Sequence, residues 1–130
     1  MHLFFSTPVW IDEIENYKNI NNDLVNFIYS EKNKDPVGTR KSNVDGWHSK
    51  PFDLNDKSLK NFLESLNPKI GKAVMDMGWD TNGQIVKITS MWSIINKQNS
   101  FNERHQHGNS ALSAAYYVEA NKNSGDIVFY

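Results

Sequence analysis

The sequence contains no cysteine, so a disulfide framework, a Cys-ligated zinc or iron–sulfur site and a thiol nucleophile are excluded. It also lacks any apolar run that approaches the roughly 18–20 residues of a membrane span. The chain does not open with a basic segment followed by an apolar one, as an export signal would. These absences predict a cytoplasmic protein with no membrane partner.

The sequence also has no large excess of positive or negative charge, and the formal net charge is only −1. Residues 1–35 sum to −3, residues 36–75 to +3 and residues 76–130 to −1. No block of like charge is present, which excludes a basic surface for nucleic acid or anionic lipid. The length of 130 residues and the 38% hydrophobic content predict one domain, residues 1–130, with a core of its own.

The N-terminal half contains two helical patterns. Residues 2–10 are aromatic and β-branched up to Pro8, which is typical of an edge strand. Residues 13–31 then change to a helical period, with Asp12 as the predicted N-cap. The apolar stripe of this predicted helix consists of Ile14, Tyr17, Leu24, Phe27 and Ile28.

Residues 32–53 contain two prolines and two glycines and predict a long loop, which is usually functional or disordered. Trp47 and His48 lie inside it and either frame a pocket or pack internally; packing is the commoner outcome. Asn55 or Asp56 is predicted to cap a second helix, which Asn67-Pro68 interrupts. A further helix is predicted over residues 68–77, with Gly78 just past its end. The second helix has its apolar residues at helical spacing, at Leu59, Phe62, Leu63 and Leu66.

The C-terminal half is rich in β-branched and aromatic residues. Strands are predicted at residues 84–95, 111–118 and 126–130, all in one antiparallel sheet with the helices against its outer face. The first strand should carry a single apolar side, formed by Val86, Ile88, Trp92 and Ile94. Helices followed by strands indicate the α+β class.

One short motif could carry chemistry, the His105-Gln106-His107 sequence between two predicted strands. Two imidazoles two residues apart in an extended segment lie on the same side, so both can bind one metal ion. The alternative is a surface loop in which two histidines occur together by chance. Tyr116 and Tyr117 must face opposite sides of their strand, so one fills the core and the other can offer a phenol to a ligand. No Gly-rich nucleotide motif and no GxSxG elbow is present.

Three segments together resemble a bacterial and phage subfamily of the 2-oxoglutarate/Fe(II)-dependent oxygenases. They are LFFSTPVWIDEI, SNVDGWHSKPFDL and the long stretch from MWSIINKQNS to the final Tyr130. The subfamily pattern is met here by Trp92, Asn96, Asn102, His105, His107, Ser113, Tyr116, Tyr117, Val118, Ser124 and Gly125. Gly108 and Ala114 stand where relatives have Pro and Gly.

The resemblance implies a double-stranded β-helix, or jelly roll, with helices packed on one side. It implies Fe(II) and 2-oxoglutarate as cofactors, and a hydroxylation that releases succinate and CO₂. By family position, His105 is the first iron ligand, and His107 stands where a carboxylate usually lies. Tyr117 is implied to hydrogen-bond the 2-oxoglutarate carboxylate, with Asn102 or Asn96 shaping the pocket.

Downstream of His107, the chain offers no candidate for the family's distal iron-binding histidine or for the basic residue that pairs with 2-oxoglutarate. His48 or His2 would have to substitute for that histidine from another part of the fold. The expectation is therefore an incomplete oxygenase that lacks the end of the barrel. The alternatives are a non-catalytic jelly-roll remnant with a binding or structural role, and a metal-binding sensor.

An incomplete barrel would leave residues 126–130 as an open apolar edge. Such an edge predicts self-association, unless residues 2–9 fold back over it. The prime substrate is not indicated by any motif.

Overall fold

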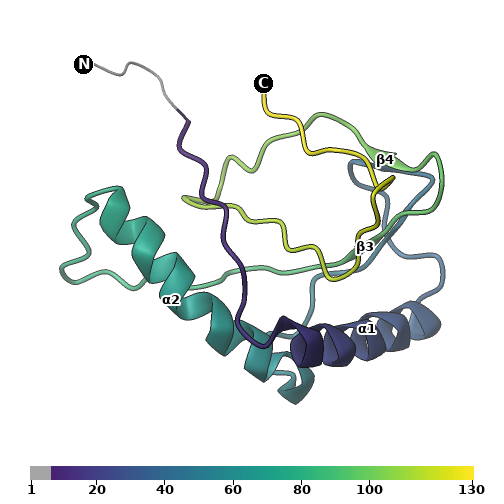
Figure 1. Ribbon diagram of the computed structural model, residues 1–130, viewed down its shortest axis with the longest axis horizontal. Coiled ribbons are helices and arrows are strands. Elements are labelled where there is room, and N and C mark those ends of the chain that lie inside the picture. Colours follow the sequence, from purple (N-terminus) through teal and green to yellow (C-terminus); the bar gives the residue numbers. More distant parts are fainter. Residues whose placement is uncertain (1–6) are drawn as a thin grey trace.

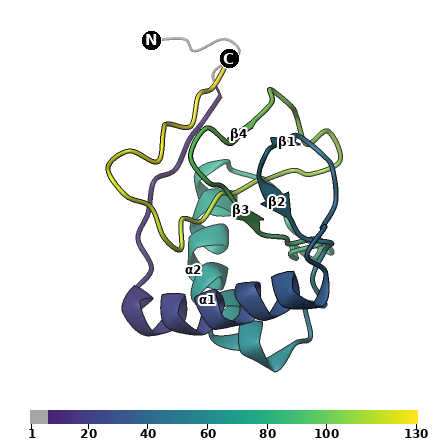
Figure 2. The same ribbon diagram turned by 90° about the vertical axis from the view of Figure 1, so that its right-hand side faces the viewer.

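The computed structural model describes residues 7–130. Two helices lie along one side of the molecule, and the segments that contain the strands lie on the other (Figures 1 and 2). The elements in chain order are α1 (Tyr17–Lys34), β1 (Asn43–Val44), β2 (Trp47–His48), the 3-10 helix η1 (Lys57–Leu59), α2 (Lys60–Asp76), β3 (Ile94–Ile95) and β4 (Phe101–Asn102). The element content is α+β, as predicted. Neither helix is long and apolar enough to cross a membrane.

Helix α1 begins four residues later than predicted. Asn16 is its N-cap, in the left-handed conformation with φ 57°, and not Asp12. The Asp12 carboxylate is used elsewhere, since its Oδ1 accepts the Glu13 N–H at 2.9 Å and the Lys69 ammonium at 2.7 Å. The capping prediction failed because this long-range ion pair holds Asp12 outside the helix.

The C-terminal end of α1 is tied to the central segment by Asp35. Lys50 Nζ lies 2.7 Å from Asp35 Oδ2, and the Gly38 N–H donates to Oδ1 at 3.2 Å. The indole N–H of Trp47 donates to the Asp35 carbonyl oxygen at 2.9 Å. Gly38 has φ +66°, and a Cβ there would lie 2.4 Å from the His48 carbonyl oxygen, so only glycine fits this crossing.

Helix α2 runs through Pro68 without a break, so the prediction of two helices separated at Asn67-Pro68 was wrong. Proline removes one helical hydrogen bond and costs about 3 kcal/mol. Burial of Phe62 before it and of Ala73 and Val74 after it compensates for that loss. Two other predictions are confirmed, since the Asp56 carboxylate caps η1 through the Ser58 N–H at 2.8 Å, and Gly78 follows the helix with φ +64°.

The core lies where α1 meets η1 and α2. Leu59 is fully buried at its centre. The buried residues of this cluster are Ile14, Ile20, Leu24, Phe27, Leu59 and Phe62. Most of them were predicted from the apolar stripes. Met91, Tyr116 and Val118 also pack against the cluster, so distant parts of the chain cover the helices.

The strands form two short antiparallel pairs, β1 with β4 and β2 with β3. Further backbone hydrogen bonds extend the pairing, from Ser49 N to Ser93 O at 3.0 Å and from Phe52 N to Met91 O at 2.9 Å. Residues 42–52 therefore run antiparallel to residues 91–103, and we call this two-stranded unit the ribbon. The prediction of a long loop over residues 32–53 was wrong in part, because residues 42–52 of this segment supply the partner strand of the ribbon.

The predicted three-stranded sheet is not formed by the described residues. Only Ile94–Ile95 is a strand within the predicted 84–95, and residues 111–118 and 126–130 contain no assigned strand. Over residues 91–95 the predicted apolar side is the more exposed one, since Met91 packs against the core and Trp92 does not. Over residues 85–88 the predicted side is the less exposed one, since Val86 is 48% exposed and Ile85 is 89% exposed. Phe52 and Met91, one from each strand of the ribbon, pack against the buried cluster between the helices. The predicted edge strand over 2–10 lies mostly outside the described residues, and residues 7–10 are not a strand.

Candidate functional site

The two neighbouring histidines follow the end of the ribbon. Strand β4 pairs with β1, and the Glu103 N–H still donates to the Ser42 carbonyl oxygen at 2.7 Å. The chain then leaves the ribbon, and His105 and His107 are both exposed. The ribbon therefore fixes the point from which the two imidazoles project.

His105 is held by a bond to its own backbone. Its Nδ1 lies 2.8 Å from the Glu103 carbonyl oxygen, which can only accept, so Nδ1 carries the proton. The lone pair of the neutral ring is then on Nε2. A metal-binding histidine usually has this arrangement, in which one nitrogen donates to a carbonyl and the other faces the ion.

The separation of the two rings fits a shared metal ion. The ring centres of His105 and His107 lie 4.9 Å apart with an interplanar angle of 87°. Two imidazoles on one ion, with metal–nitrogen bonds of about 2.1 Å and bond angles of about 90–109°, have ring centres about 4.6–5.3 Å apart. The observed distance falls inside this interval, so the pair satisfies the distance requirement for binding together.

A third histidine approaches this pair through Trp92. The His48 and Trp92 rings are stacked at 5.8 Å and 13°, and Trp92 contacts His107 at 5.6 Å and 39°. Both His48 and His107 therefore have the Trp92 indole as a neighbour. Within residues 7–130, no three side chains among His, Asp and Glu form a group that could hold a metal ion. His2 lies outside the described residues.

Trp47 and His48 pack internally, which was the commoner of their two predicted roles. Both side chains are buried. His48 Nδ1 lies 2.7 Å from the Ser49 carbonyl oxygen and 3.2 Å from Thr39 Oγ1. The buried imidazole is therefore fixed in orientation.

The two predicted pocket asparagines lie together in the ribbon, Asn96 directly after β3 and Asn102 within β4. Asn96 Nδ2 donates to Asn102 Oδ1 at 3.4 Å, and Asn102 Nδ2 donates to Ser42 Oγ at 3.2 Å. Gly46 lies close enough that a Cβ there would be 2.2 Å from Asn96 Oδ1. The structure thus pairs Asn96 with Asn102, and among residues 7–130 neither side chain forms a hydrogen bond with His105 or His107.

Tyr116 and Tyr117 face opposite ways, as predicted. The Tyr116 hydroxyl donates to Asn21 Oδ1 at 2.6 Å, and its ring lies 4.8 Å from that of Phe62. Burial raises the pKa of the Tyr116 phenol, although the bond to Asn21 opposes this shift. Tyr117 is 61% exposed and makes no hydrogen bond to any part of residues 7–130. Its phenol is thus free for a ligand.

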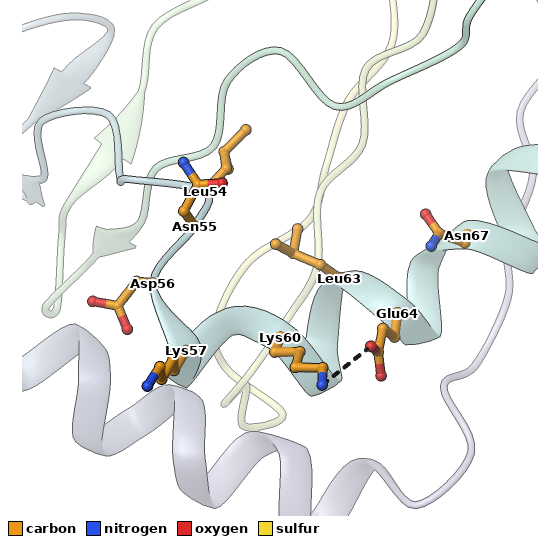
Figure 3. Close-up of a pocket in the computed structure, with 8 residues that line it drawn as sticks. All are labelled: Leu54, Asn55, Asp56, Lys57, Lys60, Leu63, Glu64 and Asn67. Atoms are coloured by element: carbon orange, nitrogen blue, oxygen red, sulfur yellow. Dashed lines mark ion pairs between the residues drawn. The ribbon is translucent and has the colours of Figure 1, made fainter.

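An open pocket lies elsewhere, at the start of α2 (Figure 3). Its volume is about 280 Å³, and Lys60 and Glu64 form an ion pair of 3.9 Å at its edge. The remaining lining residues are Leu54, Asn55, Asp56, Lys57, Leu63 and Asn67. None of the predicted site residues lines it, so this pocket is separate from the histidine pair.

Comparison with known families places the predicted site residues in one matched segment. Residues 90–130 match a family model described as "Putative 2OG-Fe(II) oxygenase". The predicted resemblance to the 2-oxoglutarate/Fe(II) oxygenase superfamily is confirmed. This matched segment, residues 90–130, contains both histidines, Trp92, both predicted pocket asparagines and Tyr117, and it excludes the two helices. Searches of curated proteins and of solved structures found no match.

The contact of Trp92 with two imidazoles was not foreseen from the sequence. A signal was present, because Trp92 belongs to the subfamily pattern, but the pattern does not say what the indole touches. That contact depends on the pairing of residues 42–52 with 91–103, which brings His48 beside Trp92.

Proposed function

We propose that this chain is an oxygenase of the hydroxylase type that depends on 2-oxoglutarate and Fe(II). The observation that supports this most directly is the 4.9 Å separation of the His105 and His107 rings. The family match over residues 90–130 supports it independently. The proposed fold is part of a jelly roll, in which the ribbon contributes two strands and the helices cover one side.

His105 and His107 are the proposed iron ligands. When bound, the iron would supply the oxidative chemistry that couples decarboxylation of 2-oxoglutarate to hydroxylation of a substrate. The Glu103 carbonyl oxygen holds the His105 proton on Nδ1 and so keeps Nε2 available as a donor. Tyr117 is the proposed hydrogen-bond donor to the 2-oxoglutarate carboxylate, and Asn102 and Asn96 the proposed polar wall of its pocket.

A second candidate is a metal-binding or structural protein without oxygenase activity. The observation that favours it is the lack of a third ligand beside the pair among the described residues. Two imidazoles alone hold an ion weakly, and a weakly held iron cannot sustain turnover. The two candidates share the histidine pair and differ in whether 2-oxoglutarate is consumed.

Succinate release in the presence of Fe(II), ascorbate and 2-oxoglutarate tests the proposal. Release by the wild type should be lost in His105→Ala and in His107→Ala. Gln106→Ala is the matched control, because it changes the exposed residue between the two histidines. Metal binding without succinate release would select a metal-binding protein, and the absence of both would contradict oxygenase activity and metal binding and leave only the structural role.

A further inference from the structure

Trp92 occupies an unusual position for an indole in this protein. It is 37% exposed and is not part of the hydrophobic cluster between the helices. Its aromatic neighbours among residues 7–130 are two imidazoles, those of His48 and His107. Trp47 provides a contrast, because that indole is buried and donates to a helix end. The packing of Trp92 is thus directed at histidines and not at the core.

His48 gives Trp92 a rigid support. It is only 7% exposed, and its Nδ1 is fixed by the Ser49 carbonyl oxygen at 2.7 Å. The His48 backbone is also held, since β2 pairs with β3 and the Thr39 N–H donates to the His48 carbonyl oxygen at 2.8 Å. The Trp92 indole lies nearly parallel to this ring, at an interplanar angle of 13° with the ring centres 5.8 Å apart.

His107 lacks such anchors of its own. It is exposed, it lies beyond the last strand, and it has no side-chain hydrogen bond to residues 7–130. Within residues 7–130, its ring centre lies 5.6 Å from that of Trp92 and 4.9 Å from that of His105. A free imidazole would sample several rotamers, and only some of them direct a nitrogen toward the same point as His105.

We propose that Trp92, supported by the buried His48, is a positioning residue that orients the His107 ring for metal binding. This inference rests on the proposed function, because it assumes that His105 and His107 bind an ion together. Trp92 and His107 are already in contact without a metal ion. This prior ordering reduces the side-chain entropy that is lost when the metal ion binds. Residues that orient metal ligands typically change metal affinity by about 10–100-fold when they are replaced.

The experiment compares Trp92→Leu with the wild type in two measurements. NMR relaxation of the His107 ring, recorded without metal, reports its order. Titration with Co(II) reports the affinity of the pair. Trp92→Leu should lower the order of the His107 ring and weaken Co(II) binding by about tenfold. Trp92→Phe, which keeps an aromatic ring, should recover part of both.

Trp79→Leu is the matched control, since Trp79 is also 37% exposed and lies outside the matched residues 90–130. It should change neither measurement, and circular dichroism should show that all variants are folded. Unchanged Co(II) affinity or unchanged His107 order in Trp92→Leu would overturn the positioning role alone. Failure of the wild type to bind Co(II) would overturn the proposed function as well.

Discussion

The helical layer, which consists of α1, η1 and α2, and the matched segment, residues 90–130, differ sharply in how they are packed. Helices α1 and α2 with η1 enclose the buried cluster around Leu59. Residues 103–130 contain no helix or strand, and most of their side chains are exposed. The whole chain exposes 11030 Å², compared with about 7,000 Å² for a folded monomer of this mass.

The residues that stabilise the fold are therefore different from the residues proposed to carry the chemistry. Apolar burial, which supplies most folding free energy, is concentrated in the helices. The candidate metal ligands and Tyr117 lie in the least buried part, where local opening costs little free energy. The segment is attached to the helical layer at few points, mainly through the ribbon and through Tyr116 and Val118.

The largest expected change in the free energy of unfolding comes from a substitution in the helical layer. Leu59→Ala removes the fully buried side chain at the centre of the cluster. It should reduce the free energy of unfolding by about 2–5 kcal/mol, because transfer and cavity terms add. Denaturant unfolding measures this change. Ile85→Ala is the control, since Ile85 is exposed and should change the free energy by less than about 0.5 kcal/mol.

The attachment of the segment to the helices is tested by a pair of neighbouring tyrosines. Tyr116→Phe removes the hydroxyl that donates to Asn21 and should cost about 1 kcal/mol of unfolding free energy. Tyr117→Phe should have no measurable effect on unfolding, because its hydroxyl has no partner among residues 7–130. Equal effects of the two substitutions would contradict the assignment of inward and outward sides.

The junction between α1 and the ribbon should respond to acid. Lys50, together with the Gly38 N–H, lowers the pKa of the Asp35 carboxyl. The folded pKa is below the unfolded one, so the stabilisation is present above the ordinary carboxyl pKa and is lost as the pH falls below it. Unfolding measured between about pH 6 and pH 2.5 should therefore show a steeper acid loss in the wild type than in Asp35→Asn. Asp23→Asn, at an exposed position within α1, is the control and should keep the wild-type slope.

The smallest effect on stability is expected at Ile127–Tyr130. All four side chains are more than half exposed, so Val128→Lys should change the unfolding free energy by less than about 0.5 kcal/mol. We propose that this apolar stretch promotes self-association, which light scattering after size-exclusion chromatography measures. Val128→Lys should reduce the association. A wild type that stays monomeric at high concentration would contradict the proposal.

The sequence predicted the parts of the fold that depend on local chemistry. The periods of Leu24 and Phe27 and of Leu59 and Phe62 located the two main helices, and Asp56 and Gly78 located two of their boundaries. These signals are local, because an apolar stripe and a cap act within a few turns of one helix.

The predictions that failed concern parts of the fold that depend on residues far apart in the sequence. Nothing in residues 42–52 indicates that they pair with residues 91–103, so a ribbon strand was predicted as a loop. Asp12 lost its capping role to Lys69, far along the chain. The histidine pair was found because its spacing is local, whereas the stack of His48 on Trp92 requires the ribbon and could not be predicted.

The central claim is that His105 and His107 bind one metal ion together. Titration with Co(II), monitored by the visible absorption of the bound ion, tests this claim most directly. The wild type and Gln106→Ala should each bind one Co(II) per chain with the same spectrum. His105→Ala and His107→Ala should each lose that binding, while unfolding as the wild type does because both residues lie outside the core. Co(II) binding that survives either histidine substitution with an unchanged spectrum would contradict the shared site.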